Sequence, residues 1–297
     1  MGTLTWPASV HQHPAQRLRV DGLRRLSDRS CKGWPFGSDM IIEMLGLPGA
    51  GKSTLSRLIA QRLAFAGIVV VEETYPRDHQ RSRLRRAVEK LSKALLFCMR
   101  EPNRAMSAVV LIGSSRQATI FDWVGSLVNF LYLGEIYRRS TDRSDVVLLD
   151  QGVAQAAWSV GFAARNQGWV GSDDMNRLLT VRPDLVVVVH ASSELILARL
   201  SQRATGASRL ERKAAGRADA LKRGQEQMDA ILELLRARQI ELVDLDNGGD
   251  TPSAIAADHV AASALGQLER LSSRRSAAVA GAGRQRMEIA RGAQSGD

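Results

Sequence analysis

Residues 46–54 of this 297-residue chain read Gly46, Leu47, Pro48, Gly49, Ala50, Gly51, Lys52, Ser53 and Thr54. They fit the pattern G-x-x-x-x-G-K-[ST], which is typical of a loop that binds nucleotide phosphates. The flanks also fit, because the short apolar run Ile41–Leu45 precedes the loop and a helical pattern over Ser53–Ala66 follows it. We therefore expect a strand, a phosphate-binding loop and a helix in this order.

The residue types in the loop explain the chemistry that we expect of it. Glycines allow backbone conformations that side chains would block, so that successive N–H groups can point into one concavity and bind phosphate oxygens. The helix that follows adds its positive N-terminal end. Lys52 is placed to reach the β- and γ-phosphates, and the hydroxyl of Ser53 is placed to ligate Mg²⁺. The sequence thus predicts ATP and Mg²⁺ as cofactors.

The rest of the chain alternates short β-branched runs with helical patterns. The further strands are expected at Ile68–Val71, Val146–Leu149, Leu185–Val189 and Ile240–Val243. Helices are expected over most of 81–139, with a break near Pro102, and over 195–203, 218–238 and 253–271. This alternation favours the α/β class, as a P-loop three-layer α/β/α domain with a five-stranded parallel sheet.

Composition divides the chain into three parts. Residues 1–39 are rich in turn formers and lack any period, which predicts a disordered leader. Met40 is a candidate translation start, and a regulatory arm is the alternative reading of the leader. Residues 40–271 form the expected domain, and 272–297, dominated by Ala, Gly, Arg and Ser, predict a disordered basic tail.

The net charge of +10 would suit a polyanionic partner, but many arginines lie in the two ends of the chain. We therefore do not expect nucleic-acid binding. No run reaches the roughly 18–20 apolar residues of a membrane span, so we expect no membrane partner. The two cysteines, Cys31 and Cys98, show no metal or disulfide spacing, which favours a reducing cytosol and a cytoplasmic location.

From Met40 to about Leu271 the chain resembles the nucleoside and nucleotide kinase group of P-loop proteins, thymidylate kinases in particular. The stretch PDLVVVVHASSELILARLSQR, residues 183–203, carries most of this resemblance. The resemblance implies an arginine-rich lid at 201–217, an adenine-contacting loop at 246–251 and, because small kinases of this kind are often dimers, a homodimer.

Two segments depart from the thymidylate kinase pattern. Asp150-Gln151-Gly152 stands where an Asp-Arg-aromatic motif is usual, and residues 72–76, EETYP, stand in place of a Glu-Pro-Gly-Gly-Thr segment. Thymidylate therefore does not follow as the substrate. The expected acceptor is a small molecule, a nucleoside or a nucleoside monophosphate.

Four further residues are predicted to act in catalysis. Asp150 ends the run VVLLD and is expected to bind Mg²⁺, the alternative being a strand-end carboxylate that caps the next segment. Glu72 and Glu73 follow the second strand; we prefer Glu73 as the group that accepts the acceptor's proton, the alternative being a solvated loop carboxylate. Arg203 and Arg209 are the first choices among the lid arginines for neutralising the transferring phosphoryl group, although solvated helix positions would also explain them.

These residues predict an ATP- and Mg²⁺-dependent phosphotransferase. A nucleotide-dependent ATPase switch that regulates a protein partner is the alternative, because Gln151 could position a water in place of an acceptor. A nucleic-acid end kinase is a third reading, and its signature would be a steep dependence of affinity on salt.

Overall fold

The computed structural model describes residues 40–72, 83–140, 146–169, 172–179, 182–202, 217–247, 254–271 and 273. Residues 1–39 and almost all of 272–297, which the sequence predicts to be disordered, lie outside this part of the chain. So do Glu73, Arg203 and Arg209.

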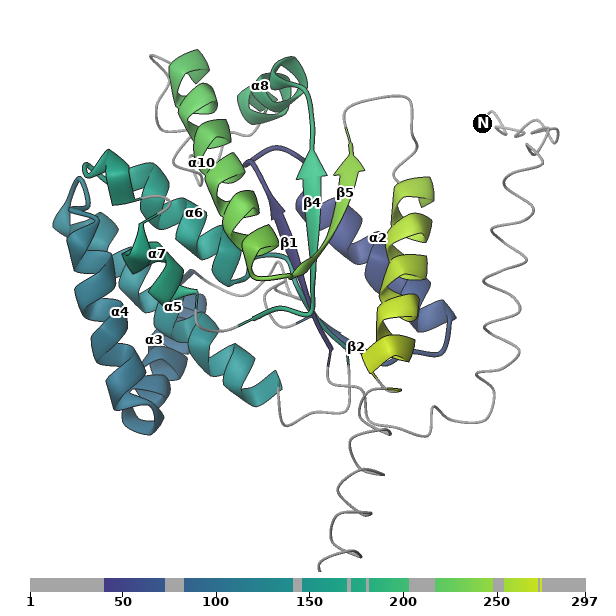
Figure 1. Cartoon of the computed structure of the whole chain (residues 1–297), viewed down its shortest axis with the longest axis horizontal. Coiled ribbons are helices and arrows are strands. Elements are labelled where there is room, and N and C mark those ends of the chain that lie inside the picture. The colour runs from purple at the N-terminus through teal and green to yellow at the C-terminus, as the bar shows by residue number, and fades with distance from the viewer. Residues whose placement is uncertain are drawn as a thin grey trace, which may run out of the picture.

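A five-stranded sheet runs through the middle of the domain (Figure 1), with strand order β2-β3-β1-β4-β5 and parallel pairing throughout. Its strands are β1 Met40–Gly46, β2 Val70–Glu72, β3 Val146–Leu149, β4 Leu185–His190 and β5 Glu241–Asp246. The expected fold class and the expected number of strands are confirmed; β3 has the predicted bounds, and the ends of the other strands shift by up to three residues.

Apart from Glu43 of β1, the central strands are made of apolar residues and glycine up to their last residues, because both faces of the sheet are covered. In β1, Ile41 and Leu45 point into one core cluster, whereas Ile42 and Met44 point into the other. Every residue of β1 and β3 is buried. This is the pattern expected of parallel strands between two helical layers.

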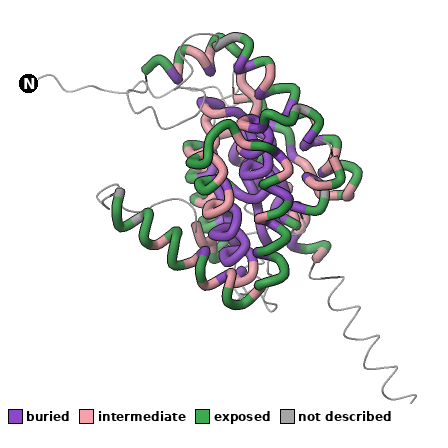
Figure 2. Tube along the Cα trace, turned by 90° about the vertical axis from the view of Figure 1, so that its left-hand side faces the viewer, coloured by how far each residue is buried: buried purple, intermediate pink, exposed green. Residues whose placement is uncertain are grey.

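Helices cover both faces. On one face lie α2, Lys52–Phe65, and a last helix over residues 254–271. Figure 1 shows these two to the right of the sheet, and the larger helical layer to its left. That larger layer contains α3 Arg83–Arg100, α4 Pro102–Ser114, α5 Ile120–Ser140, α6 Val153–Ala163, α7 Asp173–Leu178, α8 Ser193–Gln202 and α10 Arg217–Ala237. The buried residues gather between the layers (Figure 2).

The structure differs from the predicted helices in two respects. The expected helical region of 81–139 has a second break, at 115–119, where Gln117 leaves the helix and its side-chain amide donates to the carbonyl of Val160 at 2.9 Å. The helices α6 and α7 were not predicted, and α6 is the longer of the two. The sequence of α6, VAQAAWSVGFA, is buried on nearly every side, so it lacks the apolar–polar period by which a surface helix is recognised.

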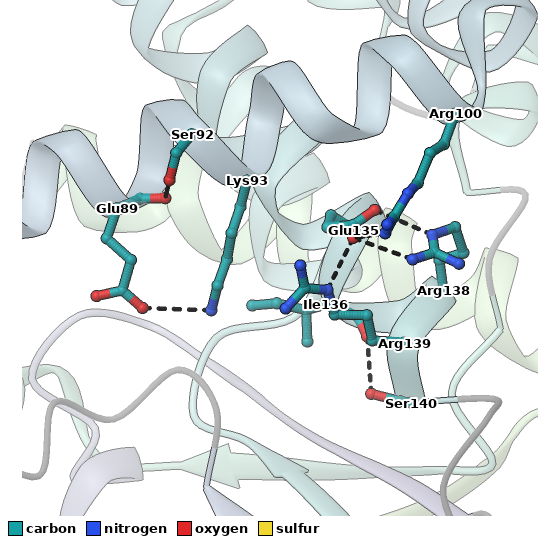
Figure 3. A network of polar contacts seen from close by, with 9 residues as sticks. All are labelled: Glu89, Ser92, Lys93, Arg100, Glu135, Ile136, Arg138, Arg139 and Ser140. Carbon is teal, nitrogen blue, oxygen red and sulfur yellow. Dashed lines mark hydrogen bonds and ion pairs between the residues drawn. The ribbon is translucent and has the colours of Figure 1, made fainter.

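A buried carboxylate fastens α3 to α5 (Figure 3). Glu135 of α5 is fully buried and accepts hydrogen bonds from Arg100 at 2.8 Å, from Arg138 at 3.0 Å and from Arg139 at 2.8 Å. Burial alone would raise the pKa of Glu135, but the hydrogen bonds and charges of Arg138 and Arg139 outweigh it and lower the pKa to about 2. The C-terminal end of α3 is thereby held against the domain.

Among the described helices, none has both the length and the apolar character that a membrane span requires.

Candidate functional site

The predicted phosphate loop lies between the end of β1 and the start of α2, as its sequence context required. Gly49 and Gly51 have φ angles of 92° and 97°, in the left-handed region that favours glycine. At Gly51, space adds a second constraint, because a Cβ atom there would lie 2.1 Å from Nδ2 of Asn247. Gly51 also precedes the first residue of α2, so the loop amides and the positive end of the helix meet here.

Lys52 lies over this loop. Its ammonium group donates to the carbonyl of Gly46 at 2.7 Å and to that of Leu47 at 3.1 Å. The charge is therefore held at the mouth of the loop, within reach of any group that the loop amides bind.

The structure brings together the two residues that were predicted to hold Mg²⁺. Because β1 pairs directly with β3, the residue after β3 lies beside the phosphate loop. The hydroxyl of Ser53 donates to Oδ2 of Asp150 at 2.9 Å, and Asp150 is only 8% exposed. A hydroxyl and a carboxylate are hard oxygen donors that fit Mg²⁺. No cluster of three or more His, Cys, Asp or Glu residues suited to a metal occurs in the described part of the chain, and Mg²⁺ commonly takes one or two protein ligands and keeps several waters.

Two residues from distant parts of the chain brace the phosphate loop. Arg199 of α8 donates to the carbonyls of Gly49 and Ala50, each at 3.2 Å, and to the carbonyl of Asn247 at 3.2 Å. Asn247, which follows β5, donates from its side chain to the carbonyl of Ala50 at 2.7 Å. The sequence placed Arg199 beside the expected lid and Asn247 in the expected adenine-contacting loop, but it did not indicate that they bind the phosphate loop.

A buried carboxylate, Glu43, is linked to the phosphate loop through Gln155. Glu43 of β1 is fully buried and accepts hydrogen bonds from the hydroxyl of Tyr137 at 2.8 Å and from the backbone N–H of Gln155 at 3.0 Å. The side chain of Gln155 in turn accepts from the N–H of Gly46 at 3.2 Å. Burial raises the pKa of Glu43 to about 7, although its hydrogen bonds act in the opposite direction.

The position of Glu43 also explains why residue 152 is a glycine. A Cβ atom at position 152 would lie 2.2 Å from Cδ of Glu43, so no larger residue fits unless Glu43 moves. The absence of an aromatic residue at position 152 therefore has a structural cause in β1, which does not extend to Gln151. Sequence reasoning missed Glu43 because it lies inside an apolar run whose other residues are core.

A pocket of about 510 Å³ lies between α3, α5 and α6 and reaches Gln151, the residue next to Asp150. Its polar lining comes from Lys90, Asp122, Ser126, Asn129, Gln151 and Ser159. Its volume falls within the range that is usual for small-molecule sites. The sequence did not predict this pocket, because its residues come from three helices and share no local pattern.

Of the two carboxylates predicted to follow the second strand, Glu72 and Glu73, the structure describes only Glu72. Glu72 is the last residue of β2, and its Oε1 atom is buried without a hydrogen-bond partner among the residues that the structure describes. Since β2 and β3 are parallel neighbours, Glu72 lies at the same edge of the sheet as Asp150. Glu73, which we preferred, and the lid residues Arg203 and Arg209 lie outside the described residues and remain predictions.

No family model and no curated protein sequence matches this chain. Solved structures do match it. The deoxyadenosine kinase from M. mycoides with bound dATP is 14% identical, with 76% of this chain and 99% of that chain covered and a TM-score of 0.44. The thymidylate kinase from Candida albicans is 17% identical, with coverages of 78% and 91% and a TM-score of 0.43. The thymidylate kinase from Ehrlichia chaffeensis is 14% identical, with coverages of 76% and 98% and a TM-score of 0.40. These proteins belong to the kinase group that the sequence resembles.

Proposed function

We propose that this protein is a cytoplasmic enzyme that transfers the γ-phosphoryl group of ATP, with Mg²⁺, to a small-molecule acceptor. The observation that carries the proposal is the contact between Ser53 and Asp150 at the mouth of the phosphate loop. This oxygen pair is adjacent, through Gln151, to a pocket of suitable size for an acceptor. A metal-binding pair between a phosphate site and a second pocket is the arrangement that phosphoryl transfer needs.

Each residue then has a role in binding or charge stabilisation. The loop amides and Lys52 would bind the phosphates, while Ser53 and Asp150 would hold Mg²⁺, which would supply positive charge next to the phosphates. Arg203 and Arg209 would close over the same group as parts of a lid. Either Glu72 or Glu73 would accept the proton of the attacking hydroxyl; Glu72 gains support from its buried, unpartnered oxygen among the described residues.

The acceptor class follows from the lining of the pocket. One cation, Lys90, and one anion, Asp122, face it together with the side-chain amides of Asn129 and Gln151. Such a lining offers donors and acceptors for a polar ring or a sugar, with one positive group for a phosphate. We infer a nucleoside or a nucleoside monophosphate as the acceptor.

The test is Mg²⁺-dependent ADP release from ATP, measured against a panel of nucleosides, nucleoside monophosphates, sugars and aminoglycosides. Lys52→Ala serves as the blank, and Lys222→Ala, an exposed lysine on α10, is the matched control. Stimulation by one acceptor class that is lost in Lys52→Ala alone is the expected result. Slow ADP release that no acceptor changes would overturn the proposal and favour the ATPase switch, in which Gln151 orients a water.

A further inference from the structure

A second cavity lies beside α4 and α7, apart from the pocket that reaches Gln151. Its volume is about 460 Å³, which is within the usual range for small-molecule sites. The first pocket is lined by α5 residues between Phe121 and Asn129, whereas Phe130 and Gly134, further along α5, line the second. Among the described residues, none lines both. We call the second one the α4 cavity, because α4 supplies more of its lining than any other helix.

The deep part of the α4 cavity is apolar. Five helices each contribute a buried apolar side chain to it, none more than 7% exposed: Phe97 of α3, Ala108 of α4, Phe130 of α5, Val153 of α6 and Leu178 of α7. Water finds few hydrogen-bond partners against such a lining. An apolar occupant would therefore be favoured over water there.

The outer part of the α4 cavity carries positive charge. Arg104 of α4 and Arg177 of α7 both line the cavity, and both are exposed. Because α4 and α7 pack against each other, the two guanidinium groups reach the same cavity. Arg104 has one long ion pair, with Glu101 at 3.7 Å, and Arg177 has none among the described residues. No acidic side chain of the described chain lines the cavity, and its remaining polar residue, Ser107, donates its hydroxyl to a backbone carbonyl.

This combination of a buried apolar lining and two exposed arginines selects the chemistry of an occupant. Arginine pairs with carboxylates through two parallel hydrogen bonds, so an acidic group at the mouth would be bound, and a cationic ligand would be repelled. A sugar or another strongly polar molecule would bury hydroxyl groups without partners against the apolar lining, which is costly. The cavity is therefore unlike the first pocket, whose lining is rich in amides and hydroxyls.

We propose that the α4 cavity is a second small-molecule site, which binds a compact apolar molecule that carries one carboxylate. The apolar body would lie against Phe97 and Phe130, and the carboxylate would lie at the mouth between Arg104 and Arg177. Such a ligand is neither the nucleotide nor the acceptor of the proposed reaction. The proposal therefore goes beyond the proposed function and does not depend on it.

The test is isothermal titration calorimetry of the full chain without nucleotide, with 2-naphthoate and decanoate as probes. Each acid is compared with its neutral alcohol, 2-naphthalenemethanol or decanol. At least one acid is expected to bind with a Kd below about 1 mM, a moderate value for a ligand of this size, and its alcohol at least about threefold more weakly. Binding of neither acid below about 1 mM overturns the proposal, and so does equal affinity for acid and alcohol.

Two charge variants locate the carboxylate. Arg104→Gln and Arg177→Gln should each weaken the binding of the acid at least about threefold, because each removes one charged partner at an exposed site. The affinity for the alcohol should stay within about twofold, which a general disturbance of the cavity would not allow. Arg236→Gln, at an exposed arginine in the last turn of α10, is the matched control and should bind the acid as the wild type does. Unchanged binding of the acid in both cavity variants overturns the proposal.

A cavity-filling variant locates the apolar body. In Ala108→Leu the larger side chain would occupy part of the cavity, so the acid and the alcohol should both bind at least about tenfold more weakly. Circular dichroism checks that this variant is folded, and if it is not, the two arginine variants decide alone. A folded Ala108→Leu protein that binds the acid as the wild type does would place the probe elsewhere and overturn the proposal. None of these measurements uses catalytic activity, so failure here is separate from failure of the proposed reaction.

Discussion

Ser53 and Asp150 are separated by 97 residues in the sequence, yet their side-chain oxygens lie 2.9 Å apart beside the phosphate loop. We expect Asp150→Asn to raise the Mg²⁺ concentration needed for half-maximal turnover. The loss of a charged ligand should cost about 1.5–3 kcal/mol, which corresponds to about ten- to hundredfold in kcat/KM. Steady-state ADP release across a Mg²⁺ titration measures this. Asp173→Asn, an exposed position on α7, should behave as the wild type; equal Mg²⁺ dependence in the two variants would remove Asp150 from the metal site.

Gly152 should not tolerate a side chain. The Cβ atom of Gly152→Ala would lie 2.2 Å from Cδ of Glu43, so that Glu43 or the start of α6 must move. Overpacking of this kind costs about 1–3 kcal/mol in the free energy of unfolding, measured by urea denaturation. The control is Gly125→Ala in α5, where a Cβ atom would meet nothing within 4 Å and where alanine should stabilise the helix by about 0.5–1 kcal/mol. A Gly152→Ala protein as stable as wild type would contradict the packing described here.

Glu43 should make stability depend on pH. Its pKa is about 7 in the folded chain against 4.5 as the ordinary value, so the folded state retains a proton that the unfolded state releases between these values. The resulting stabilisation is complete below about pH 4.5 and is lost as the pH rises to about 7; its size is on the order of 3 kcal/mol. Urea denaturation at pH 5 and at pH 8 measures the difference.

Glu43→Gln is the matched control for this dependence. A neutral amide can still accept from the N–H of Gln155 and donate to the oxygen of Tyr137, so the fold should be kept while the proton release is removed. The fall in stability from pH 5 to pH 8 should then be smaller in Glu43→Gln than in the wild type. Parallel pH profiles for the two proteins would show that another group is responsible.

Replacing Asn247 should weaken the binding of ATP more than the binding of the acceptor. Asn247→Ala removes the hydrogen bond to the carbonyl of Ala50, and the phosphate loop loses part of its brace. Losing one such hydrogen bond costs about 0.5–1.5 kcal/mol, so we expect the KM for ATP to rise about two- to tenfold while the KM for the acceptor changes little. Asn103→Ala, at an exposed position of α4, is the control. An equal rise in both KM values would indicate general disruption rather than a role at the phosphate loop.

Much of the fold could be predicted because its signals are local. The phosphate loop is nine consecutive residues, and its function depends on the backbone, which glycines permit to turn. Buried parallel strands such as Val146–Leu149 are continuous β-branched or aliphatic runs, and the structure has this strand at the same bounds. The helix α6 escaped prediction for the complementary reason, since a segment that is buried on nearly all sides has no period to detect.

The sequence by itself determined that this chain has a loop with the phosphate-binding pattern, an α/β fold and a carboxylate at the end of its third strand. The strand order determined which residues meet at the site, because placing β3 next to β1 brings Asp150 to Ser53 and Gly152 to Glu43. The pocket and the exposure of apolar residues on α3, such as Leu84 and Met99, also arise only from packing, since they depend on which face each helix turns toward its neighbours. Local periodicity records that a helix has an apolar side, but only tertiary packing decides whether that side meets the core or solvent.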